Sequence, residues 1–209
     1  RLQNSQLVAD IDSVKLDSIE VGIRGNADTY SYEIAGFYMK KDNVIFQDGT
    51  RTNVDNGASK HVGVEGMFEY RFPQDVSVRF NGSYAAHTYD FDNFTDDINW
   101  NGLDIDTAPR NFGSIQLNWA PADKVKAGLE WIYMGEYFME PTNTFKYDGH
   151  NYFNLRIEAE AMEGVDIFLR LMNITNVRSA ERADWTRFSD ERYFVGRPRA
   201  VFGGVRARF

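Results

Sequence analysis

Segments in which apolar and polar side chains alternate recur along the whole chain. In one of them, Ala127, Leu129 and Trp131 occupy one parity, while Lys126 and Glu130 occupy the other. Because successive side chains of a β-strand point to opposite faces, this period of two predicts strands with one apolar and one polar face. Nine strands are predicted, over 16–24, 29–41, 61–72, 76–88, 112–120, 124–137, 150–161, 165–173 and 199–209.

The connections between these strands alternate between short and long. Short ones lie at 25–28, 73–75, 121–123 and 163–164, and long ones at 42–60, 89–111, 138–149 and 174–198. Barrels of the bacterial outer membrane have this asymmetry, with tight periplasmic turns and extended extracellular loops. The pattern predicts an all-β fold, a transmembrane antiparallel up-and-down β-barrel segment. The alternative is a soluble antiparallel barrel whose apolar face points inward.

Composition narrows the functional classes. The 209 residues contain no run of 18 apolar residues, so no transmembrane helix is expected, and the mean hydropathy of -0.49 suits strands that are apolar at every second position. The 15% aromatic content suits the girdles at two membrane interfaces. A net charge of -8 argues against nucleic-acid binding. The absence of cysteine excludes disulfides and thiol catalysis, and no cofactor is predicted.

The last predicted strand sets the direction of all the others. If it descends to the periplasm, strand counting makes the first strand descend from the extracellular side as well. Complete bacterial barrels have an even number of strands and begin in the periplasm. Nine strands are therefore expected to pair with an upstream part of the same barrel.

Several segments resemble one known family, the TonB-dependent outer-membrane receptors. The resemblance lies in 17–25 with 30–39, in 61–66, in 108–111, in 152–156, in 171–176 and in 193–209. At 174–176, Ile-Thr-Asn replaces the family's more common Leu-Phe-Asp. The resemblance implies that residues 1–209 are the C-terminal portion of a 22-stranded barrel. It also implies an upstream plug domain, contact with TonB through an N-terminal region, and outer-membrane lipid around the barrel.

The C-terminal strand resembles the signal that the barrel-assembly machinery reads. An unpaired edge strand is a template for strand addition, although lipid contact alone would also explain the apolar parity. That parity consists of Val201, Gly203, Val205, Ala207 and Phe209.

The long loops contain guanidinium and indole groups that suit a bulky anionic ligand such as a ferric siderophore. The alternative is a network of loop salt bridges, with Glu181, Asp184, Asp190 and Glu191 as the acids. The candidate ligand-binding residues are Trp100, Arg110, Arg178, Arg182, Trp185 and Arg187.

Charged residues on the polar parity of the strands are expected to line the lumen and face the plug. Mutual pairing and hydration of the wall is the simpler alternative. They are Glu65, Glu69, Arg79, Glu130, Arg156, Glu158 and Arg170.

Metal and catalytic motifs are weak. Asp90, Asp92 and Asp96 form a calcium candidate, because oxygen ligands recur in one acidic loop. The histidines at 61, 87 and 150 are scattered, with no close ligand pairing expected. No catalytic motif is present, and the chain is not expected to be an enzyme.

The sequence therefore predicts part of a bacterial outer-membrane receptor for energy-coupled uptake of a bulky nutrient. An iron chelate is the preferred ligand, with oligosaccharide or cobalamin still open. A passive porin-type channel and a soluble β-barrel binding module remain as alternatives.

Overall fold

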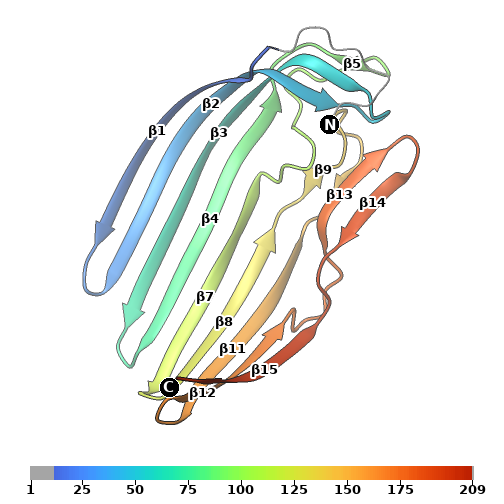
Figure 1. Cartoon of the computed structure of the whole chain (residues 1–209). Coiled ribbons are helices and arrows are strands. Elements are labelled where there is room, and N and C mark those ends of the chain that lie inside the picture. Colours follow the sequence, from blue (N-terminus) through green and yellow to red (C-terminus); the bar gives the residue numbers. More distant parts are fainter. Residues whose placement is uncertain (1–11, 209) are drawn as a thin grey trace.

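A single nine-stranded antiparallel sheet forms most of the molecule (Figure 1). The computed structural model describes residues 12–208. Strands that follow one another in the sheet also follow one another along the chain, which confirms the predicted all-β up-and-down order. They are β1 (Lys15–Asn26), β2 (Tyr30–Gln47), β3 (Asn53–Phe72), β4 (Val76–Tyr89), β7 (Asn111–Ala122), β8 (Val125–Met134), β11 (His150–Met162), β12 (Val165–Met172) and β15 (Ala200–Ala207).

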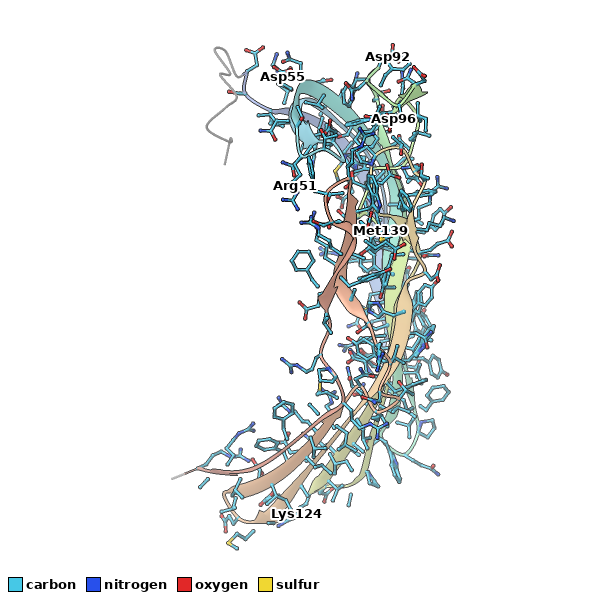
Figure 2. All side chains as sticks on the ribbon, turned by 90° about the vertical axis from the view of Figure 1, so that its right-hand side faces the viewer. Arg51, Asp55, Asp92, Asp96, Lys124 and Met139 are labelled. Atoms are coloured by element: carbon cyan, nitrogen blue, oxygen red, sulfur yellow. The ribbon has the colours of Figure 1, made fainter. Side chains whose placement is uncertain are left out.

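Within the described residues, the two edge strands of this sheet are β1 and β15, and they do not pair with each other. Figure 2 shows the sheet curved along its strands, with both ends bending toward the same side. Lys124 lies at the short-turn end, while Asp92 and Asp96 lie at the opposite, long-loop end. Over residues 12–208, no helix is both long and apolar enough to cross a membrane.

The strand register separates the side chains into two faces. Leu117, Leu129 and Leu155 are register partners in one row across β7, β8 and β11. This apolar face is uncovered within the described part of the chain: Phe68 is 46% exposed and Val205 is 68% exposed.

In the described residues, buried hydrophobic side chains gather at the long-loop end, and two of them, Ala85 and Tyr89, belong to strand β4 of the sheet. Tyr89 and Trp100 are almost completely buried and pack with Phe46 and Phe91. A second cluster surrounds Met139. Three small hairpins organise these loops: β5 (Phe94–Thr95) with β6 (Ile98–Asn99), β9 (Tyr137–Phe138) with β10 (Lys146–Tyr147), and β13 (Ala180–Thr186) with β14 (Asp190–Val195).

The prediction of a long loop over 42–60 is wrong. β2 and β3 continue pairing past the expected strand ends, through Val44↔Gly57 and Phe46↔Val54, so that only 48–52 connects them. The Asp48 carboxylate closes this turn by accepting hydrogen bonds from the backbone N–H groups of residues 50 and 52. Register shifts after Lys41 and Val44 obscure the alternation in the sequence.

The strand predicted over 124–137 ends earlier, at Met134. The N–H of Gly135 donates to the carbonyl of Asn111 at 2.8 Å, and a Cβ at Gly135 would lie 1.6 Å from the Asn111 Oδ1. The chain leaves the sheet at this position, and the close approach of Asn111 leaves room for glycine but not for a side chain. Tyr137 then begins the separate strand β9.

Candidate functional site at the long-loop end

The β13–β14 hairpin lies over the polar face of the sheet (Figure 2). Beneath its root is an open cavity of about 920 Å³. Polar groups of the sheet, among them Glu65, Asn81 and Glu130, form one wall, and Glu181 and Arg197 lie on the hairpin side. The cavity is therefore lined both by polar residues of the strands and by the segment between β12 and β15, the longest connection between sheet strands in the described residues.

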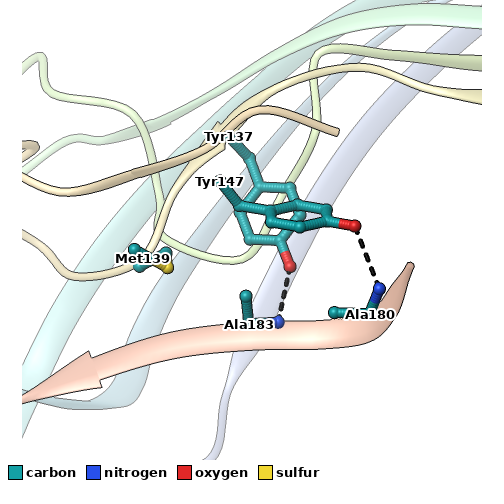
Figure 3. Close-up of a cluster of buried hydrophobic side chains, with 5 residues drawn as sticks. All are labelled: Tyr137, Met139, Tyr147, Ala180 and Ala183. Carbon is teal, nitrogen blue, oxygen red and sulfur yellow. Dashed lines mark hydrogen bonds between the residues drawn. The ribbon is translucent and has the colours of Figure 1, made fainter. Parts of the chain in front are cut away.

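Two tyrosine hydroxyls hold β13 in place (Figure 3). The N–H of Ala183 donates to the Tyr137 hydroxyl oxygen at 2.7 Å, and the N–H of Ala180 donates to the Tyr147 hydroxyl oxygen at 3.0 Å. Both alanines are buried, at 0% and 2% exposure. These bonds satisfy backbone donors that would otherwise be buried without partners. The sequence carries no signal for them, because they join segments more than 30 residues apart.

Asn173 fixes the root of the hairpin. Its side-chain amide donates to the carbonyls of Val177 at 2.9 Å and Arg197 at 3.0 Å, while its Oδ1 accepts from the Val177 N–H at 2.9 Å. Its own N–H donates to the Asn154 Oδ1 at 2.9 Å. This 2% exposed side chain thus ties the segment 174–196 to the sheet.

The tip of the hairpin reaches the β2–β3 turn. Trp185 stacks on Phe145, with 4.7 Å between ring centroids, and the Trp185 N–H donates to the carbonyl of Met139 at 3.0 Å. The N–H of Arg187 donates to the carbonyl of Gly49 at 2.9 Å. The hairpin therefore bridges loops from both halves of the chain.

The predicted ligand-binding arginines and tryptophans occupy different environments. Trp100 is fully buried and donates from Nε1 to the Thr95 hydroxyl at 3.2 Å, so its side chain is not on a ligand-accessible surface. Trp185 is half-buried, and Arg178 is exposed. Arg110 holds Asp104 through two hydrogen bonds of 2.7 and 3.0 Å.

Part of the alternative salt-bridge network is also present on the hairpin. The buried Asp184 carboxylate pairs with Arg192 at 2.6 Å and Arg182 at 3.2 Å. Arg187 pairs with Asp96 of the β5–β6 loop at 2.7 Å. The side chains of Arg182 and Arg187 nevertheless remain more than half exposed, at 57% and 55%.

All seven predicted lumen-wall residues share the polar face. Glu69 accepts hydrogen bonds from Arg71 and Arg79. Glu130 accepts from Gln116 and Asn154, at 2.9 Å each. The others are more exposed or more weakly paired. Arg156 donates to Asn118 at 2.7 Å, and Glu158 meets Arg206 at 3.4 Å. Arg170 stacks over Phe168, and no ion pair is found for Glu65 within 12–208.

The calcium candidate residues do not converge. Asp90 pairs with Lys60 and Lys40, and Asp92 accepts hydrogen bonds from Asn99 and Asn101, which lower the pKa of its carboxyl. In the described part of the chain no group of three or more His, Cys, Asp or Glu is placed to hold an ion.

Asp106, a half-buried acid, belongs to the same acidic segment that the sequence singles out for calcium. Asp106 accepts a hydrogen bond from the Tyr89 hydroxyl at 2.5 Å. Burial raises the pKa of the Asp106 carboxyl, an effect that the Tyr89 hydrogen bond opposes. On the hairpin, the hydrogen bond to Glu191 raises the pKa of the exposed Tyr193 hydroxyl to about 12.

The histidine expectation is wrong for one pair. Strand register places His61 opposite His87, with 2.8 Å between their Nδ1 atoms. The predicted strand-addition residues Val201, Gly203, Val205 and Ala207 lie on β15, the sheet edge, in register with β12. Phe209 lies outside the described residues.

Comparison with known proteins identifies the architecture. The family model "TonB dependent receptor-like, beta-barrel" matches residues 3–176. The ferric yersiniabactin uptake receptor FyuA from Yersinia pestis is similar over 94% of this chain and 30% of its own, with 18% identity and a TM-score of 0.78. The ferric citrate transporter FecA matches 91% of this chain and 31% of its own, at 15% identity and a TM-score of 0.76.

The copper transporter OprC is similar as well, over 96% of this chain and 32% of its own, at 15% identity and a TM-score of 0.77. The chain therefore spans about a third of the length of these solved structures. At such identities the likeness concerns the fold.

Proposed function

The chain belongs to the TonB-dependent receptor-like β-barrel family, and from this premise we propose that it is part of a bacterial outer-membrane receptor for energy-coupled uptake of a bulky nutrient. The exposed apolar face of the sheet supports the location, because a lipid-facing surface needs no covering layer. On this proposal the long-loop end is extracellular, and the short turns are periplasmic.

An iron chelate is the proposed substrate. The supporting observation is the segment 174–196, which contains the β13–β14 hairpin. Its root borders the polar cavity, and it carries Arg178, Arg182 and Arg187 with exposed side chains. Guanidinium groups bind carboxylate and catecholate oxygens with charge-assisted hydrogen bonds. Trp185, half-buried between loops, positions the hairpin, while Arg110 is held by Asp104. Trp100 is left out of the proposed contact surface because it is buried.

The charged side chains of the polar face are proposed to contact a plug domain. Glu65 is exposed, and the cavity it lines also carries Glu33 and Glu130, so the wall is rich in acids. A plug that presents cations there would neutralise them. Contacts within the wall already occupy part of the polar groups of the remaining charged residues, so the plug can rearrange along them without leaving them unpaired. These residues are Glu69, Arg79, Arg156, Glu158 and Arg170.

The edge strand β15 is proposed to be read by the barrel-assembly machinery through Val201, Gly203, Val205, Ala207 and Phe209. The described members of this set are on an edge strand with an open side, the geometry that strand addition requires. The further partners are the upstream strands of the same barrel and TonB, which would contact the receptor through its N-terminal region.

Uptake measurements test the proposal. The full-length receptor is expressed in a strain that lacks other iron receptors, and uptake of radiolabelled ferric citrate and of a ferric catecholate is followed with and without an uncoupler. The expected result is saturable uptake of at least one chelate that the uncoupler abolishes. Uptake that rises linearly with concentration and ignores the uncoupler would establish a passive channel instead.

Two variants connect uptake to the hairpin. Arg178→Gln with Arg182→Gln is expected to raise the half-saturating concentration about 10-fold, equivalent to roughly 1.4 kcal/mol. Lys124→Gln, at the opposite end of the sheet, is the matched control and should leave uptake unchanged. If both variants had the same half-saturating concentration for uptake, the hairpin would not be part of the ligand site.

A further inference from the structure

Two histidines of neighbouring strands face each other on the polar side of the sheet. His61 of β3 and His87 of β4 are register partners, and their Nδ1 atoms are 2.8 Å apart. Their ring centroids are 5.1 Å apart, and both side chains are half-buried, so solvent reaches them. When both rings are neutral, the Nδ1–H of one donates to the Nδ1 lone pair of the other. The two Nδ1 atoms therefore face each other at hydrogen-bonding distance.

Ser59 orients one of these rings. Its Oγ lies 3.0 Å from the His61 Nε2, and the serine is 1% exposed. If the Nε2–H is donated to Ser59, the lone pair of His61 resides on Nδ1 and points toward His87. Metal-binding histidines are commonly fixed in this way, by a hydrogen bond from the nitrogen that does not ligate.

The residues around the pair supply a further donor and opposing charges. On β2, the neighbour of β3 on the side away from β4, Met39 is the register partner of His61. It shares the same face of the sheet, so its thioether is a soft donor in the same row. Lys41, on β2, places an unfavourable positive charge nearby, whereas the Asp104 carboxylate near His87 favours a cation. Asp104 is held by Arg110 and contributes charge without being free to ligate.

We infer that His61 and His87 form a binding site for a late first-row transition-metal ion, with their two Nδ1 atoms as the protein ligands. Two nitrogens that each lie about 2.0–2.1 Å from one ion are roughly 3 Å apart when they are adjacent ligands, close to the observed separation. Cu²⁺ and Zn²⁺ both accept imidazole. On binding, His87 changes tautomer: it gives up its Nδ1 proton and gains one at Nε2, so both rings ligate as neutral imidazoles and no net proton is released.

The remaining coordination positions fall to water, to Met39 or to a chelator that arrives with the ion. A site with two imidazole ligands exchanges its ion readily, which suits transient contact with a metal on the polar face. This assignment does not depend on the identity of the transported nutrient, since it rests on the side chains of β3 and β4 alone.

Copper titration of the full-length receptor in detergent tests the site. CuCl₂ is added at neutral pH, and electron paramagnetic resonance reports the ligands of the bound ion. One equivalent with two imidazole nitrogens is expected, displaced by ZnCl₂ and released on acidification, because imidazolium cannot ligate. His61→Gln and His87→Gln should each abolish the two-nitrogen signal, and the matched variant His150→Gln should retain it.

Ser59→Ala keeps both imidazoles and covers the case in which the histidine variants do not fold. Loss of this orienting partner should weaken Cu²⁺ binding roughly 10-fold. The inference is overturned if the native receptor shows no two-imidazole copper signal, or if His61→Gln and His87→Gln leave that signal intact. Uptake of iron chelates would be unaffected by either result, so failure of the metal site is distinguishable from failure of the proposed function.

Discussion

The side-chain amide of Asn173 donates a hydrogen bond to the main-chain carbonyl of Arg197 at 3.0 Å, and this contact joins the two ends of the segment that contains β13 and β14. The same amide reaches the carbonyl of Val177, so one buried side chain organises the whole root of the hairpin. Asn173 itself sits directly after β12, a strand of the sheet. The hairpin is thereby anchored to the wall above which it lies.

Asn173→Ala is expected to release the hairpin. The substitution leaves buried backbone groups without partners, which costs about 1–3 kcal/mol. Hydrogen exchange over residues 180–195 of the full-length receptor should become faster. Asn176→Ala is the control, because the exposed Asn176 makes only a 3.2 Å contact with the Arg199 N–H. Equal exchange in the two variants would contradict the anchoring role.

Tyr137→Phe tests the second anchor of the hairpin. It removes the oxygen that accepts the buried Ala183 N–H, again at about 1–3 kcal/mol of local stability. Exchange at the Ala183 amide should increase, whereas Tyr133→Phe should not affect it, since no hydrogen bond of the Tyr133 hydroxyl is found among the described residues. An Ala183 amide that is equally protected in native and Tyr137→Phe receptors would show that another group holds β13.

Asp106 makes the loop that follows β4 sensitive to pH. Its folded-state pKa is raised, so between the ordinary aspartate value of 3.8 and the raised value only the folded loop binds the proton. Stability of this loop is therefore highest below that window and falls as pH rises through it. Glu140 strengthens the shift, and Arg182 opposes it.

Hydrogen exchange over residues 89–106, corrected for the intrinsic pH dependence, should show greater protection at acidic than at neutral pH. Asp106→Asn should flatten this dependence and increase protection at neutral pH. Asp92→Asn, in the same loop, provides a contrast, since hydrogen bonds lower the pKa of Asp92. Persistence of the native pH profile in Asp106→Asn would assign it to another group.

The adjacent residues Met67 and Phe68 separate the two faces of the sheet. Both are large and apolar, but Phe68 belongs to the exposed apolar face and Met67 to the polar face, opposite Glu33. Phe68→Arg should cost about 2–4 kcal/mol in the bilayer, and Met67→Arg far less. The measurement is the fraction of receptor that reaches the heat-modifiable, folded form in outer membranes. Similar losses for both variants would contradict the lipid-facing assignment.

The sheet could be predicted from the sequence because each strand carries its own signal. Alternation fixes which face a side chain occupies, and turn lengths fix which strands are neighbours, so the polar row from Glu69 to Glu130 followed from local pattern. Where the register shifts after Lys41, the alternation is interrupted and the extended β2–β3 hairpin was missed. The loop contacts could not be predicted in the same way. The burial of Trp100, the His61–His87 pair and the Tyr137–Ala183 bond depend on register or on contacts between distant loops.

The inside–outside assignment of the sheet is the central claim, and a spin-label scan tests it most directly. The chain contains no cysteine, so single cysteines can be introduced and labelled at 114–118 of β7 in the full-length receptor in lipid vesicles. Labels at 115 and 117 should collide with membrane-dissolved oxygen more often than labels at 114, 116 and 118, because Ile115 and Leu117 lie on the exposed apolar face. A uniform profile, or one with the opposite phase, would contradict the account.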